Sequence, residues 1–117
     1  MTTTEQITNV ATALGWSVET DASRPGFTEF EFRQYSPAGQ DFGFSVEMRN
    51  GDRDSLMQVL EKYYEAYDSD FDAYLWIGTD GHGKNGAPYH IKDIVSDMEA
   101  AEAMIDTLYE TLKTALK

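Results

Sequence analysis

The spacing of apolar residues along the chain is typical first of a helix, then of strands, and then again of helices. Residues 4–14 place apolar side chains at the i, i+3, i+4, i+7 spacing of one helix face. Thr2 or Thr3 can cap this helix, and Gly15 ends it. The alternation that begins at Trp16 then indicates a short strand.

Two longer strands are predicted next. Phe30 and Phe32 share one face of the first strand, and charged residues occupy the other face. After the turn-forming run "SPAGQ", the second strand shows the clearest period of two, with inward residues Phe42, Phe44, Val46 and Met48. This pattern predicts an antiparallel sheet with one aromatic face and one charged face.

A helix is predicted to cover the aromatic face of the sheet. Asp52 or Asp54 can cap this helix, which spans residues 55–67. Its apolar stripe comprises Leu56, Val59, Leu60, Tyr63, Tyr64 and Tyr67. An acidic loop, "DSDFD", then leads into the apolar run 73–77, which either adds a fourth strand or packs as an irregular segment.

Two helices are predicted in the last part of the chain. The segment "YHIKDIV" forms a short helix after Pro88, and Ser96 with Glu99 makes a capping box that begins a long final helix. The inward residues of that helix are Met98, Ala101, Ile105, Leu108 and Leu112. The prediction is one α+β domain over residues 1–117, with the order α-β-β-β-α-(β)-α-α. Its helices pack on one face of an antiparallel sheet of three strands, or four if 73–77 pairs.

Composition and charge narrow the class of function. The 117 residues contain no cysteine, which excludes disulfides, thiolate catalysis and cysteine-based zinc sites. Long apolar runs and a basic N-terminal region are missing, so we expect a cytoplasmic protein without a membrane span. Nine Lys and Arg against 21 Asp and Glu give a net charge of −12, which repels nucleic acids and attracts basic surfaces. The alternative is that the acidity only keeps the protein soluble.

The stretch "GTDGHGKNGAP", residues 78–88, has the Gly-x4-Gly-Lys spacing of a phosphate-binding loop. Such a loop must lead directly into a helix whose N-terminal amides bind the anion. No helix can begin directly after Lys84, and Asn85 stands where a hydroxyl should bind magnesium. We therefore interpret the stretch as an exposed connecting or contact loop rather than a nucleotide site.

Metal chemistry has two candidate sets of side chains. Asp80, His82 and His90 are suitable ligand types, and a small metal-assisted hydrolase using them is one alternative, although their spacing matches no established pattern. The run from Asp68 to Asp72 resembles the beginning of a calcium loop, but it lacks the glycine and glutamate that such a loop needs later. We expect no resident metal and no cofactor.

Nucleic-acid binding is excluded by charge. The α-β-β-β-α order resembles the double-stranded RNA-binding domain, which has a basic start to its last helix. Here the corresponding segment reads "GDRDSL" and is acidic. We therefore expect no direct contact with nucleic acid.

The acids are concentrated in two parts of the chain. One part lies between residues 47 and 72. In the final helix, acids recur at three- and four-residue steps, with no Lys or Arg between Lys92 and Lys113. At about 1.5 Å per residue this gives a carboxylate every ~4.5 to 6 Å, comparable to one phosphate per ~3.4 Å along a DNA strand. The pattern is consistent with a DNA mimic that engages a nucleic-acid-binding groove, and a merely soluble helix face is the alternative.

The second half of the chain, in particular "GKNGAP" with "DIVSDMEAAE", resembles small acidic proteins of unknown function from bacterial mobile elements and phages. The resemblance extends to antirestriction and anti-CRISPR proteins, several of which are small, acidic and non-enzymatic. It implies an inhibitor that acts by binding a protein. It implies no roles for individual residues.

These observations together predict a non-enzymatic acidic inhibitor that occupies the basic nucleic-acid-binding surface of another protein. A Cas nuclease is the leading target, and a restriction enzyme is next. An immunity protein for a basic nuclease toxin is the alternative within the binding class. The expected contact residues are Asp52, Asp54, Asp68, Asp70, Asp72, Glu99, Glu102, Asp106 and Glu110, with Lys84 and Tyr89 at the edge.

Overall fold

The computed structural model describes residues 2–84 and 87–115, and these ranges contain four helices and three strands. In chain order the elements are α1 (Thr3–Ala13), β1 (Ser17–Asp21), β2 (Phe27–Tyr35), β3 (Asp41–Arg49), α2 (Arg53–Ala66), α3 (Ser69–Tyr74) and α4 (Ile91–Ala115). The strands form one antiparallel sheet in the order β1-β2-β3. The predicted α+β class is confirmed, and the sheet in the described residues has three strands.

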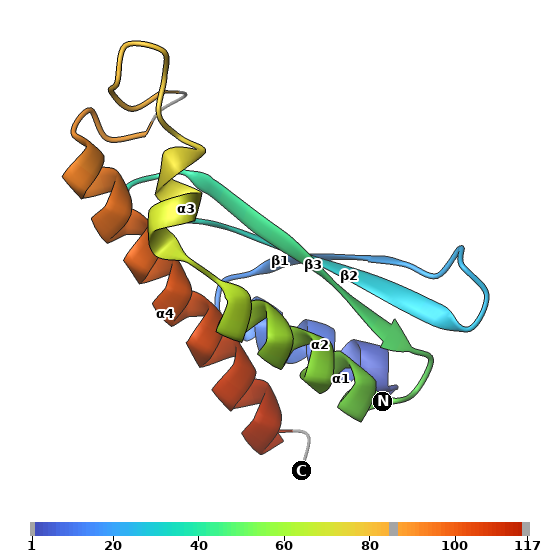
Figure 1. Ribbon diagram of the computed structural model, residues 1–117. Helices are drawn as coiled ribbons and strands as arrows, with labels where there is room; N and C mark the ends of the chain where they lie inside the picture. Colours follow the sequence, from blue (N-terminus) through green and yellow to red (C-terminus); the bar gives the residue numbers. More distant parts are fainter. Residues whose placement is uncertain (1, 85–86, 116–117) are drawn as a thin grey trace.

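One face of the sheet is buried and the other faces solvent, because burial alternates along β2 and β3. The helices lie on the buried side (Figure 1). Phe32 pairs with Phe44 across the two strands, and their ring centroids are 5.4 Å apart. Trp16 packs edge-on against Phe44, with centroids 5.6 Å apart. The predicted aromatic face is therefore confirmed as the centre of the core.

The ends of α1 and α2 are capped as the sequence predicts. The Thr2 hydroxyl oxygen accepts a hydrogen bond from the Glu5 backbone N–H at 3.1 Å. An Asp52 carboxylate oxygen accepts one from the Ser55 N–H at 3.3 Å. Each cap satisfies an amide that has no partner within its helix. Gly15, with φ of +97°, follows α1 in the left-handed conformation that terminates helices.

Most of the predicted apolar stripe of α2 faces the core. Leu56 and Leu60 are fully buried, and Tyr63 stacks on Phe44 with centroids 4.5 Å apart. Val59 is 39% exposed, so its predicted inward position is wrong. It lies at the edge of the stripe, where the helix surface turns toward solvent.

The last helix is longer than predicted. A single helix runs from Ile91 to Ala115, so the separate short helix and the capping box at Ser96 are both wrong. No glycine or proline interrupts the chain there, and Ser96 is an exposed residue inside the helix. The predicted inward residues are confirmed as buried, namely Met98, Ala101, Ile105, Leu108 and Leu112.

Residues 68–77 also differ from the prediction. The acidic loop is the short helix α3, and Asp68 caps it by accepting hydrogen bonds from the backbone N–H groups of Asp70 and Phe71. The following apolar run does not form a fourth strand in the described part of the chain, where Ile77 makes only an isolated bridge with Gly83. The local cap at Asp68 therefore outweighs the strand preference of the aromatic residues that follow it.

A buried polar network joins α4 to the turn between β2 and β3. The Asp97 carboxylate accepts hydrogen bonds from the Ser36 hydroxyl at 2.5 Å, the Ala38 N–H at 2.9 Å and the Gln40 side-chain amide. Ser36, Gln40 and Asp97 are all buried. Among the described residues Asp97 forms no ion pair, so these donors compensate for its loss of hydration.

Candidate functional site

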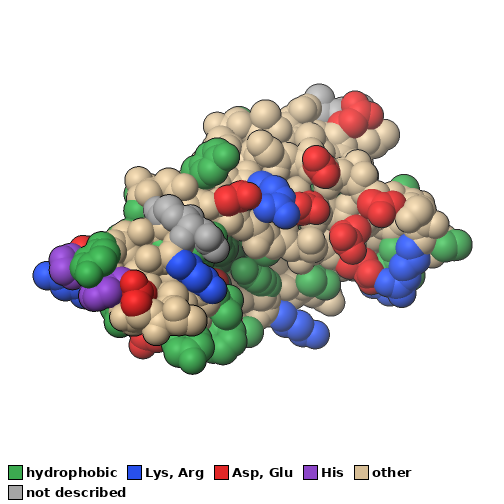
Figure 2. Space-filling model, turned by 90° about the horizontal axis from the view of Figure 1, so that it is seen from above, with side chains coloured by type: hydrophobic (Ala, Val, Ile, Leu, Met, Phe, Trp, Pro, Cys, Tyr) green, Lys and Arg blue, Asp and Glu red, His purple; other side chains and the backbone are tan. Residues whose placement is uncertain are grey.

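The arginines neutralise carboxylates on the sheet side of the molecule and at the turn into α2. Their ion pairs are Arg24 with Glu47, Arg33 with Glu31 and Asp41, Arg49 with Asp52, and Arg53 with Asp54. In the view from above, acidic and basic side chains lie next to one another (Figure 2). Two of the predicted contact residues, Asp52 and Asp54, therefore belong to a mixed-charge surface.

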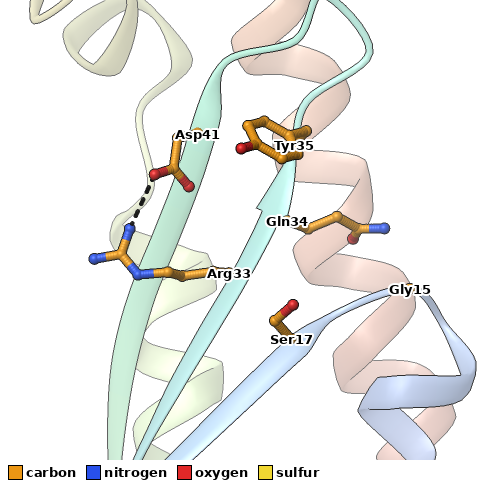
Figure 3. Close-up of a pocket in the computed structure, with 6 residues that line it drawn as sticks. All are labelled: Gly15, Ser17, Arg33, Gln34, Tyr35 and Asp41. Carbon is orange, nitrogen blue, oxygen red and sulfur yellow. Dashed lines mark hydrogen bonds and ion pairs between the residues drawn. The ribbon is translucent and has the colours of Figure 1, made fainter.

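The sheet side also carries a shallow hollow beside the end of α1. Its lining consists of Gly15, Ser17, Arg33, Gln34, Tyr35 and Asp41. Arg33 turns toward Asp41, at 3.4 Å, while Gln34 points to the opposite side of the strand (Figure 3). The pKa of Arg33 is raised by Glu31 and Asp41, which hold its charge. Arg33, the cation among the described lining residues, is thus already paired with Glu31 and Asp41.

The opposite side of the molecule carries an acidic groove between α2 and α4. We define this acidic groove by its lining residues, Glu61, Tyr64, Glu65, Asp106, Tyr109 and Glu110. Within the described residues none of its carboxylates forms an ion pair. The Tyr109 hydroxyl donates a hydrogen bond to Glu61 at 3.4 Å. The groove therefore combines carboxylates from two helices with two tyrosine rings, and the ammonium group of Lys113 lies over the Tyr109 ring, 6.0 Å from its centroid.

The carboxylates of the acidic groove help to raise the pKa values of its two tyrosines. The pKa of Tyr64 is raised, first by the charge of Asp106 and further by Glu102 and Glu110. The pKa of Tyr109 is raised by loss of hydration and by Glu61. Negative charge close to a phenol disfavours the phenolate. Carboxylates of α4 therefore act together on a side chain of α2, as expected if both helices present one acidic surface.

The structure brings part of the predicted contact set together. Glu102, Asp106 and Glu110 lie along the α4 side of the acidic groove or beside it. Glu99 is exposed one turn before them. Glu61 and Glu65 complete the surface, but the sequence analysis did not include them in the contact set. Their four-residue spacing on α2 is the sequence signal that could have found them.

The three aspartates around α3 form a second acidic cluster, separate from the acidic groove. Asp68 is the cap of α3, Asp70 is exposed, and Asp72 is half-buried beside the Tyr67 hydroxyl. Loss of hydration raises the pKa of Asp72, and the hydrogen bond to Tyr67 opposes this. Asp70 and Asp72 belong to a helix, so the resemblance to a calcium loop does not extend to the structure.

The glycine-rich loop is a compact connection rather than a phosphate site. The Gly78 N–H donates to the His82 carbonyl at 2.7 Å, and the Lys84 N–H donates to the Trp76 carbonyl at 2.9 Å. The next helix begins only at Ile91, so its N-terminal amides do not follow Lys84. The described residues after Lys84 therefore differ in arrangement from a phosphate-binding loop. Asn85, the other residue used in that argument, lies outside the described residues.

The histidines of this loop are engaged in ring contacts. The His82 ring stacks on Tyr89 with centroids 3.9 Å apart, and His90 lies edge-on to Tyr89 at 5.3 Å. Asp80 accepts a hydrogen bond from the His82 backbone N–H at 3.1 Å. Across the described residues no group of His, Asp and Glu side chains is placed to hold a metal ion. The geometry thus gives no support to the hydrolase alternative that used Asp80, His82 and His90.

Helix α3 and the glycine-rich loop lie at one end of the molecule (Figure 1). Several large apolar side chains of these segments and of the residues that follow them are exposed. They are Phe71, Tyr74, Leu75, Tyr89 and Ile91, with Phe71 62% and Tyr74 69% exposed. The sequence analysis named only Tyr89 as a contact residue. The others were missed because aromatic residues in an apolar run are usually core residues. Exposed apolar side chains of this size are a common feature of surfaces that contact other proteins.

Comparisons of the chain with protein-family models, with curated proteins and with solved structures found no match. The function therefore has to be argued from the geometry. Among the helices described here, none is long and apolar enough to cross a membrane.

Proposed function

We propose that this protein is a non-enzymatic inhibitor that binds the basic, nucleic-acid-binding surface of another protein. The observation that carries the proposal is the acidic groove, where carboxylates of α2 and α4 face solvent together. The arginines are paired with other acids on the sheet side and at the turn into α2. Solubility alone does not require carboxylates of two helices to line one groove.

The spacing of the carboxylates supports mimicry of a nucleic acid. Along α4 the acids recur at three- and four-residue steps, about 4.5 to 6 Å apart along the helix axis. A second row on α2, formed by Glu61 and Glu65, runs beside the first. Two neighbouring rows of negative charge offer a groove that normally binds phosphates a comparable set of ion pairs.

A Cas nuclease is the leading target in this proposal, and a restriction enzyme is the next. Both are named because the sequence is predicted to resemble acidic proteins of mobile elements and phages. Both targets act in the cytoplasm, and we place this protein there too. An immunity protein for a basic nuclease toxin would use the same acidic groove, and a toxin gene next to the gene of this protein would distinguish that case.

Neutralising the acidic groove tests the proposal. The test variant carries Glu61→Gln, Glu65→Gln, Glu102→Gln, Asp106→Asn and Glu110→Gln. The matched control makes the same change in net charge on the sheet side, with Glu19→Gln, Glu29→Gln, Glu31→Gln, Asp41→Asn and Glu47→Gln. Both are added to a panel of purified Cas nucleases and restriction enzymes, and DNA cleavage is measured.

We expect the unmodified protein and the sheet-side control to inhibit at least one nuclease of the panel. The variant of the acidic groove should need at least ~100-fold more protein for the same inhibition, because several charge pairs are lost together. Equal inhibition by the two variants would refute the assignment of the contact surface. A panel without any inhibited nuclease would refute the proposed function.

A further inference from the structure

A second recess lies where α2 ends and α3 begins, and it differs in chemistry from the acidic groove. We call it the aromatic hollow and define it by its lining residues, Tyr63, Ala66, Tyr67, Asp68, Phe71 and Asp72. Three aromatic rings and two carboxylates meet there. In Figure 1, α3 follows the end of α2 directly and packs beside α4.

The tyrosine rings of the aromatic hollow are held in place by the core. Tyr63 stacks on Phe44 at 4.5 Å, with the ring planes 14° apart. Tyr67 packs edge-on against Phe42 at 6.1 Å, and its hydroxyl donates a hydrogen bond to the Met98 carbonyl at 2.9 Å. These contacts fix two walls of the hollow before any partner arrives, which reduces the entropic cost of binding.

The third ring, Phe71, has no comparable support. It projects from the first turn of α3 and is 62% exposed. An apolar ring that is exposed to water is unfavourable, so a bound group that covers the ring gains free energy. Phe71 therefore provides a ring face that a partner can cover.

The carboxylates of the aromatic hollow lack a cation. Asp68 uses one oxygen to cap α3, which leaves the other oxygen available. Asp72 is half-buried, and burial raises its pKa. In the described part of the chain neither Asp68 nor Asp72 forms an ion pair. A cation that entered here would face two carboxylates and would compensate the half-buried one.

This combination of groups matches one side chain in particular. A guanidinium is planar, stacks on aromatic faces and donates several hydrogen bonds to carboxylates in a fixed geometry. An ammonium can pair with the acids, but it is more strongly hydrated and cannot stack in the same way. We propose that the aromatic hollow receives one arginine side chain of the protein partner, stacked against Phe71 and paired with Asp68 and Asp72. This inference rests on the proposed function for the existence of a basic partner.

The inference can be tested without knowing the partner. The probes are three peptides, acetyl-Gly-X-Gly-amide with arginine, lysine or citrulline at X. Each is titrated into the isotopically labelled full chain, and the ring and backbone signals are followed by NMR. We expect the arginine peptide to shift the signals of Tyr63, Tyr67 and Phe71. The lysine peptide should bind about fivefold more weakly, and citrulline should cause no saturable shift.

Two variants and a matched control locate the site. Asp72→Asn should weaken binding of the arginine peptide about tenfold, because it removes a charged acceptor. Phe71→Ala should weaken it about fivefold, and this exposed residue can be replaced without disturbing the core. Asp70→Asn is the control, because Asp70 is an exposed acid of the same helix that does not line the hollow. It should leave binding within about twofold.

Several results would overturn the inference. One is equal shifts with all three peptides, and another is a shift at Tyr64 and Tyr109 in place of the hollow, which would indicate general attraction to acidic surfaces. Unchanged binding by Phe71→Ala would also refute it. The peptide titration and the nuclease panel can fail separately. If the hollow binds the arginine peptide but the protein inhibits no nuclease, only the proposed function is refuted.

Discussion

The buried Asp97 network predicts a large loss of stability in the variant Asp97→Ala. The substitution removes the acceptor of three hydrogen bonds and leaves the hydroxyl of Ser36 and the side-chain amide of Gln40 buried without it. The third donor, the N–H of Ala38, belongs to an exposed residue and can bind water instead. A buried donor without a partner costs about 1–3 kcal/mol. Two such donors therefore predict a decrease of ~2–6 kcal/mol in the free energy of unfolding.

Urea denaturation followed by tryptophan fluorescence measures this loss, because Trp16 is buried in the core. The midpoint should fall while the m-value stays constant. Glu99→Ala is the matched control, since it removes an exposed acid from the same helix and should change stability by less than about 0.5 kcal/mol. Asp97→Asn should be less destabilising than Asp97→Ala, because its amide keeps one acceptor and can donate to the Gln40 side-chain oxygen, which has no partner. A loss below ~0.5 kcal/mol for Asp97→Ala would refute this reasoning.

Two further predictions concern Tyr63 and Gly83. Burial raises the pKa of Tyr63 from 10.0 to about 12, so its contribution to stability is complete below pH 10 and is lost as the pH rises from 10 to 12. Tyr63→Phe should reduce this alkaline loss in unfolding experiments at a series of pH values, and an identical pH profile would contradict the assignment. A Cβ at Gly83 would overlap the Pro88 carbonyl oxygen, so Gly83→Ala should displace the loop and shift the NMR signals of the Tyr89 ring, whereas unchanged signals would contradict the close packing.

The elements in which apolar residues recur with a clear period could be predicted from the sequence, whereas the short helix α3 could not. The alternation of Phe42, Phe44, Val46 and Met48 allows only one face to be buried, and the structure follows it. Helix α3 has six residues, too few to show a helical period, and only the cap at Asp68 marks its beginning. Ser96 and Glu99 show the converse error, because a capping-box pattern also occurs inside a continuous helix.

The candidate site was predictable along each helix but not between helices. The acids of α4 follow from their spacing, whereas the position of Glu61 and Glu65 beside them depends on how α2 packs against α4. Asp97 illustrates the same limit. In the sequence it is one acid among many, and only the packing of the β2–β3 turn against α4 shows that it is a buried structural residue.

The acidic groove gathers carboxylates of α2 and α4 that form no ion pairs in the described residues. The four arginines lie on the sheet side and at the turn into α2, whereas Lys62, Lys92 and Lys113 belong to α2 and α4 themselves. In the proposed function, the net charge of −12 draws a basic partner toward the molecule while the two are still apart. Association with such a partner should therefore be fast at low salt and should slow as salt is added, because salt screens the attraction.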